Sequence, residues 1–178
     1  MSFFNRRRFL MSTAIASVVL SLPAMAAPAK WTIRQVSTDL LDIGYYEAGP
    51  EEGRPIILLH GADGDLERFA EVVPHLVSEG LRVVVPYLRG HGSTTPLDKA
   101  APASTQEVVL GQDVLDLMNA LHIPEAVLGG FDLGGRAVTA AATLRPSRCV
   151  ALVTVNSAPQ PALAEVLGQM ARMGTWRT

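Results

Sequence analysis

A short stretch of glycines around one aspartate constrains this chain more than any other feature. The run from Val127 to Val138 reads VLGGFDLGGRAV: an apolar segment, a Gly-x-Asp-x-Gly turn, and then small residues suited to a close-packed helix. This pattern predicts a strand that turns into a helix so sharply that its apex, Asp132, is strained and the flanking positions cannot carry side chains. Asp132 would then stand at a helix start, where unpaired N–H groups favour negative charge. Taken alone, the stretch also fits an aspartate that merely caps the helix.

Two earlier segments repeat the combination of a buried strand and a glycine-rich turn. The apolar run 55–59 is followed by His-Gly-Ala, and the run 82–86 is followed by the loop 87–93, which contains Gly-His-Gly. In a parallel sheet, ligands bind beyond the carboxyl ends of the strands. We therefore expect polar side chains to gather at this edge of the sheet: His60, Arg89, Asp132 and Asn156.

In this order and spacing, the three motifs resemble those of the α/β-hydrolase superfamily over about residues 35–157. The resemblance implies an α/β-hydrolase fold, an α/β architecture with a mostly parallel, doubly wound sheet. It places Asp132 at the nucleophile elbow, where serine usually stands. It also implies that the backbone N–H groups of Ala62 and Leu133 form an oxyanion hole. Five more residues would line or support the pocket: His60, Gly61, Arg89, Gly130 and Gly134.

An aspartate at the elbow is similar to that of epoxide hydrolases and dehalogenases within the superfamily. A carboxylate that attacks saturated carbon gives an alkyl-enzyme ester, whereas attack on a substrate ester would give a reactive anhydride. The related dehalogenases place tryptophan or arginine after the nucleophile, and this chain has Leu133. The resemblance therefore favours an epoxide-hydrolase-like enzyme acting on a small organic molecule. Arg136 is expected to point outward from its helix.

Other functions stay open. An ester or lactone hydrolase could use Asp132 as a base, a dehalogenase is a further alternative, and a non-catalytic binding protein or remnant would need no nucleophile. In the superfamily the catalytic histidine follows the nucleophile, but every histidine here precedes Asp132: His60, His75, His91 and His122. We therefore expect an amino-terminal piece, with a sheet truncated after the strand that follows the elbow helix, and no activity from the piece alone.

Hydrophobic periodicity supplies the remaining elements. The predicted strands are 31–36, 41–47, 56–59, 83–86, 126–130 and 150–155, the first two forming an antiparallel hairpin. The predicted helices are 66–78, 105–121 and 134–144, and 93–104 is expected to be a surface loop.

The amino terminus resembles a twin-arginine signal peptide. Residues 5–11 read NRRRFLM, an apolar run follows from Ala14 to Leu22, and residues 24–26 read AMA, an A-x-A cleavage site. We expect residues 1–26 to be removed and residues 27–178 to form the amino-terminal part of the hydrolase domain. The mature protein would then be periplasmic or secreted, without stable insertion into the membrane.

Composition limits the partners. The formal net charge is −2, and it becomes −5 without residues 1–26, which carry three arginines and no acidic residue. This balance indicates no nucleic-acid partner. The motifs imply neither a cofactor nor a metal. Cys149 is the single cysteine, so no internal disulfide can form, and its apolar surroundings predict a buried structural thiol.

Overall fold

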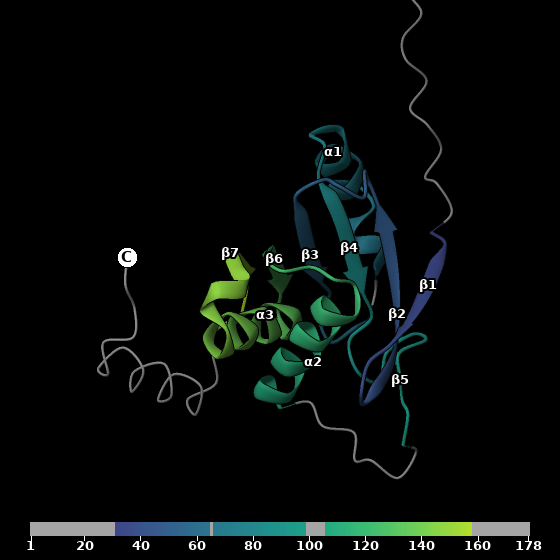
Figure 1. The fold of residues 1–178 in the computed structure, drawn as a ribbon, viewed down its shortest axis with the longest axis vertical. Coiled ribbons are helices and arrows are strands. Elements are labelled where there is room, and N and C mark those ends of the chain that lie inside the picture. Colours follow the sequence, from purple (N-terminus) through teal and green to yellow (C-terminus); the bar gives the residue numbers. More distant parts are fainter. Residues whose placement is uncertain (1–30, 65, 99–105, 158–178) are drawn as a thin grey trace, which may run out of the picture.

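One sheet organises the molecule. The structure, a computed structural model, describes residues 31–64, 66–98 and 106–157. The strands follow the order β1-β2-β4-β3-β6-β7, and β5 pairs with β2 (Figure 1). Their bounds are β1 Ile33–Ser37, β2 Leu41–Ala48, β3 Pro55–Leu59, β4 Arg82–Pro86, β5 Thr95–Pro96, β6 Ala126–Phe131 and β7 Cys149–Val155. The helices are α1 Val72–Ser78, α2 Glu107–Ala120 and α3 Leu133–Leu144, with short 3-10 helices η1 Leu66–Phe69 and η2 Pro146–Arg148.

The strand directions confirm the predicted fold class. Strand β1 pairs antiparallel with β2, and β2 pairs antiparallel with β4. Strands β4, β3, β6 and β7 then run parallel to their neighbours. The predicted hairpin is therefore present at one edge, and the carboxyl ends of four parallel strands meet at one side of the sheet.

Apolar side chains cover both faces of the sheet, as a doubly wound arrangement requires. On one face, α2 and α3 lie side by side (Figure 1), and residues such as Met118 and Val138 pack with Ile57 and Leu128 of the sheet. On the other face, Val73 of α1 belongs to a second cluster with neighbouring strand residues. Each fully buried Leu, Met or Val side chain contributes about 1.5–3 kcal/mol, so these two layers hold the parallel strand ends in place.

The predicted helix 66–78 is wrong in one respect, because the segment is divided. It contains η1 and, after a break at residues 70–71, the separate helix α1. Pro74 explains the restart: proline has no N–H to donate, so it fits within the first turn of a helix but not in its interior. Helix α1 begins at Val72, which places Pro74 in that first turn. The predicted loop 93–104 also contains a short strand, β5, since residues 95–96 pair with residues 41–42 of β2.

Strand β7 is exposed on both faces at the end of the described sheet. Val150, Leu152, Val153 and Val155 are between 43% and 60% exposed. Cys149, at its start, is only partly buried, and burial raises the pKa of its thiol. A strand edge with unpaired backbone groups and apolar side chains readily pairs with another chain.

We expect self-association through β7, and a lysine on this strand should weaken it. Val153→Lys places a charge at the edge, where it opposes intermolecular pairing. Size-exclusion chromatography with light scattering, over a range of concentrations, should show a smaller mass for this variant than for the native chain. Val108→Lys is the matched control, because Val108 is 49% exposed on α2. Equal behaviour of the two variants would contradict a role for β7.

The predicted signal peptide lies outside the described residues. Across the part of the chain that the structure describes, there is no helix with the length and apolar character needed to span a membrane.

Candidate active site

Asp132 stands at a strained apex between β6 and α3. Its backbone has φ +50° and ψ −119°, and a positive φ is rare for a residue with a side chain. Two glycines permit the turn: a Cβ on Gly130 would lie 2.6 Å from the carbonyl carbon of Gly134, and a Cβ on Gly134 would lie 2.3 Å from the carbonyl oxygen of Leu59. Because these neighbours are backbone atoms, they cannot move aside. The chain therefore holds the Asp132 side chain at the carboxyl ends of the parallel strands, 42% exposed.

The loop after β3 brings a backbone donor to this carboxylate. The Ala62 N–H donates to Asp132 Oδ2 at 3.3 Å, across 70 residues of sequence. Gly61 allows the approach, since a Cβ there would be 2.8 Å from the Phe131 ring and 3.3 Å from Asp132 Oδ2. Leu133, the other predicted donor, is the first residue of α3. Its N–H therefore belongs to the positive end of the helix.

His60 lies beneath this loop and is completely buried. The Leu88 N–H donates to His60 Nε2 at 2.9 Å, and His60 Nδ1 lies 2.6 Å from the Gly61 carbonyl oxygen. Because Nε2 accepts a hydrogen bond, Nδ1 carries the proton and donates it to Gly61. The Gly61 carbonyl and the Ala62 N–H belong to the same peptide unit. His60 therefore fixes the orientation of the peptide that points its N–H at Asp132.

Arg136 turns toward the site, so the expectation that it points outward is wrong. Its Nη2 lies 3.8 Å from Asp132 Oδ1, and its Nε lies 3.8 Å from Oε1 of Glu107. The Arg136 side chain is 23% exposed and that of Glu107 only 8%. A buried carboxylate on α2 attracts the guanidinium inward, where it adds positive charge beside Asp132. The spacing of four residues from Asp132 was the signal in the sequence, since such residues share one side of a helix.

Arg89, expected to line or support the pocket, joins the loop after β4 to α2. Its Nε and Nη2 donate to the two carboxylate oxygens of Asp113 at 2.9 and 2.7 Å. Both side chains are about nine-tenths buried. Burial raises the pKa of the Asp113 carboxyl, an effect that the Arg89 guanidinium opposes, and the hydrogen bond to Asp113 raises the pKa of Arg89. The ion pair therefore anchors the loop that carries Leu88 and His91.

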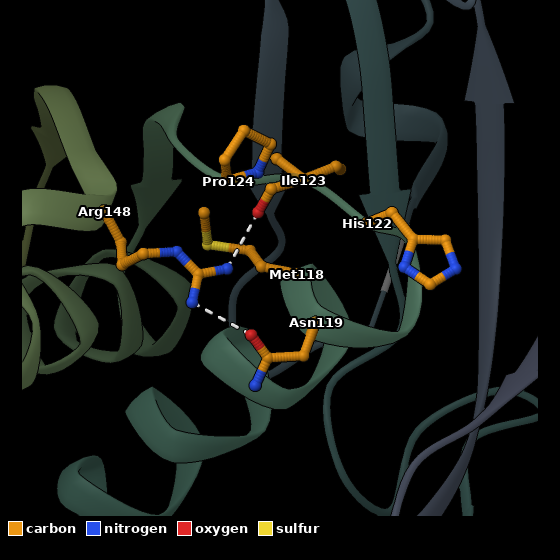
Figure 2. Close-up of a pocket in the computed structure, with 6 residues that line it drawn as sticks. All are labelled: Met118, Asn119, His122, Ile123, Pro124 and Arg148. Atoms are coloured by element: carbon orange, nitrogen blue, oxygen red, sulfur yellow. Dashed lines mark hydrogen bonds between the residues drawn. The ribbon is translucent and has the colours of Figure 1, made fainter.

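A surface hollow of about 470 Å³ lies at the amino-terminal ends of β6 and β7, opposite the strand ends near Asp132 (Figure 2). It is formed where α2 leads into β6 and where η2 leads into β7. Arg148 donates to Oδ1 of Asn119 at 2.9 Å and to the carbonyl oxygen of Ile123 at 2.7 Å, as Figure 2 shows. These bonds join the chain segments before β6 and β7. The hollow contains none of the residues around Asp132.

At the strand ends, the Asp132 carboxylate accepts a hydrogen bond from the Ala62 N–H and stands at the start of α3. Within the described ranges, no group of three His, Cys, Asp or Glu side chains could hold a metal ion. The sequence model of the alpha/beta hydrolase fold matches residues 54–177, more than half of the chain. The chain belongs to the α/β-hydrolase fold family. The strand order, the turn at Asp132 and the loop at Ala62 thus lie within a fold built to present a nucleophile at this edge.

Several proteins of this family are similar in sequence and structure. A Klebsiella pneumoniae protein classed as a proposed epoxide hydrolase has 39% identity and a TM-score of 0.67, over 79% of this chain and 50% of its own. Epoxide hydrolase A of Mycobacterium thermoresistibile has 26% identity and a TM-score of 0.62, over 70% and 39%. Among curated proteins, the esterase YbfF of Escherichia coli is 32% identical over 59% of this chain and 39% of its own length. The chain spans half or less of each of these α/β-hydrolases.

Proposed function

We propose that this protein is a hydrolase of the epoxide-hydrolase type, with Asp132 as its nucleophile. The observation that carries the proposal is the carboxylate at the apex of the turn, with the Ala62 N–H 3.3 Å from Oδ2. A serine at this place would need a base to become a nucleophile, whereas a carboxylate is already charged. Arg136 on its other side stabilises that charge.

The reaction follows from this geometry. Oδ1 or Oδ2 of Asp132 attacks a ring carbon of the epoxide, the ring C–O bond breaks, and the released oxygen takes up a proton from solvent water. Water then attacks Cγ of the resulting ester. The tetrahedral oxyanion forms next to the Ala62 and Leu133 N–H groups, and its collapse releases a diol and restores the carboxylate. The net reaction adds one water molecule to one epoxide.

We assign the base for the second step to neither His60 nor His91. A histidine that acts as this base needs a ring nitrogen free to accept a proton from water. His60 is buried, with its ring nitrogens hydrogen-bonded to the loops after β3 and β4. Both ring nitrogens of His91 contact backbone carbonyl oxygens. A base of the kind that the mechanism requires would have to approach Asp132 from elsewhere.

An ester or lactone hydrolase is the second candidate. It is favoured by the esterase and lipase relatives, including the diacylglycerol lipase ABHD11 of Xenopus laevis, 29% identical over 72% of this chain. In that reaction Asp132 would act as a base for water and would never become covalently bound. Whether Asp132 becomes covalently modified therefore distinguishes the two functions.

Mass spectrometry of Asp132 tests the proposal. The chain is incubated with styrene oxide, and its tryptic peptides are analysed. We expect a mass increase of one epoxide on the peptide containing Asp132 if the ester persists. If the ester turns over, hydrolysis in heavy-oxygen water should place solvent oxygen in the Asp132 carboxylate. Diol formation with an unlabelled, unmodified Asp132 would overturn covalent catalysis. Hydrolysis of a lactone with Asp132 unlabelled would support the second candidate, and the absence of adduct, diol and lactone hydrolysis would support a binding protein.

We also propose export through the twin-arginine route, on the basis of residues 5–11 and 24–26. The combined change Arg6→Lys and Arg7→Lys keeps the positive charge but removes the arginine pair. We expect it to leave the uncleaved precursor in the cytoplasm, measured by immunoblots of cell fractions. Arg8→Lys is the matched control. Unchanged processing of the double variant would exclude this route.

A further inference from the structure

The His91 side chain, from the loop that follows β4, packs against the loop that follows β3. Its ring lies edge-on to the ring of His60, with 5.1 Å between the centroids and 64° between the planes. Gly64 leaves room for it, since a Cβ there would lie 2.6 Å from Cδ2 of His91. The side chain is only partly buried, so packing of the core does not account for this placement.

Both ring nitrogens of His91 contact backbone carbonyls. Nε2 lies 3.2 Å from the Ala62 carbonyl oxygen, and Nδ1 lies 3.2 Å from that of Arg89. A carbonyl oxygen can only accept a hydrogen bond, so each contact needs an N–H on the ring. The tautomer with hydrogen on Nε2 makes the Ala62 contact, and the imidazolium ion makes both.

With the contact from His91 to Ala62, both peptide units that flank the Ala62 backbone are hydrogen-bonded. His60 holds the peptide unit before Ala62, through the Gly61 carbonyl, and His91 holds the unit after it, through the Ala62 carbonyl. With the units on both sides fixed, rotation about the Ala62 backbone bonds is restricted. The N–H of Ala62 then stays directed at Asp132.

We propose that His91 is a positioning residue that directs the Ala62 N–H into the oxyanion hole by a hydrogen bond from Nε2. This inference rests on the proposed function for its catalytic consequence. Its structural content, that the His91 side chain fixes the Ala62 amide, is independent of the substrate. The effective contact is the one at Nε2, because the contact at Nδ1 joins His91 only to its own loop.

Two amide variants separate these contacts. The amide nitrogen of glutamine reaches about as far along the side chain as Nε2, and that of asparagine about as far as Nδ1. His91→Gln should therefore keep the hydrogen bond to Ala62, and His91→Asn should keep only the one to Arg89. In ¹⁵N-labelled chains, we expect the Ala62 amide resonance and its hydrogen-exchange rate to be near native in His91→Gln and altered in His91→Asn and His91→Ala. Matching circular dichroism spectra will verify that the variants are folded.

The lifetime of the Asp132 ester from styrene oxide provides the catalytic measurement. Because a misdirected donor stabilises the oxyanion less, we expect ester hydrolysis to slow roughly 10- to 100-fold in His91→Ala and His91→Asn, and His91→Gln to restore it. An Ala62 amide unaffected in His91→Asn, or restored equally by both amide variants, would overturn the proposal. If the native chain forms no ester, the proposed function fails, and the Ala62 amide still decides the role of His91.

Discussion

Asp132→Ala is expected to abolish covalent capture of an epoxide completely, while the chain stays folded. The side chain is 42% exposed at the apex of the turn, so its removal leaves no cavity in the core. Alanine retains the backbone and loses only the nucleophile. Intact-mass spectrometry after incubation with styrene oxide should show no adduct, whereas the native chain should gain the mass of one epoxide.

Two control variants make this result specific. Asp132→Asn preserves the size of the side chain and replaces the carboxylate by a much weaker nucleophile, so it should also form no adduct. Asp116→Asn changes a partly buried carboxylate on α2, hydrogen-bonded to Gln112, and should react like the native chain. An adduct or diol that persists in Asp132→Ala would mean that the elbow aspartate only caps α3.

The second large effect concerns stability. Arg89→Met should reduce the free energy of unfolding at pH 7 by about 3–5 kcal/mol, because it leaves the buried Asp113 carboxylate without its partner. Urea denaturation followed by circular dichroism measures this loss. The same substitution at Arg34 is the matched control: its side chain is 59% exposed, and its partner Glu47 retains Arg82 at 2.7 Å. Arg34→Met should cost at most about 1 kcal/mol.

The stability of Arg89→Met should depend on pH through the Asp113 carboxylate that has lost its partner. Burial already raises the pKa of Asp113, and removal of the guanidinium raises it further. A carboxyl whose pKa is higher in the folded than in the unfolded chain stabilises the fold below the unfolded value, about 3.9. That stabilisation is lost as the pH rises through the folded pKa. The deficit of the variant should therefore shrink as the pH is lowered from 7 toward 4.

A second substitution tests whether the unpaired charge is the cause. Adding Asp113→Leu to Arg89→Met removes the buried carboxylate, and we expect it to recover most of the lost stability, since an apolar pair can replace a buried ion pair. A double variant as unstable as Arg89→Met alone would show that the loss comes from packing of the Arg89 stem.

The secondary structure could be predicted closely wherever the pattern is local. The run 55–59 was predicted as a buried strand because it is continuously apolar, and β3 confirms it. The pattern of the turn at Asp132 likewise requires only neighbouring glycines. The division of 66–78 into η1 and α1 was missed, although Pro74 carried the signal. Periodicity reports which face of a helix is apolar, and that face can continue across a break in the backbone hydrogen bonds.

The sequence by itself determined the fold class, the elbow and the side of the sheet where its aspartate stands, because strand alternation and glycine turns are properties of short segments. Only the tertiary structure decided which distant groups meet there. Ala62 reaches Asp132 across 70 residues, and Arg89 pairs with Asp113 on α2. Arg136 turns inward because Glu107 is buried opposite it. Such pairings depend on how two elements pack and on which charge is buried, and no local pattern carries that information.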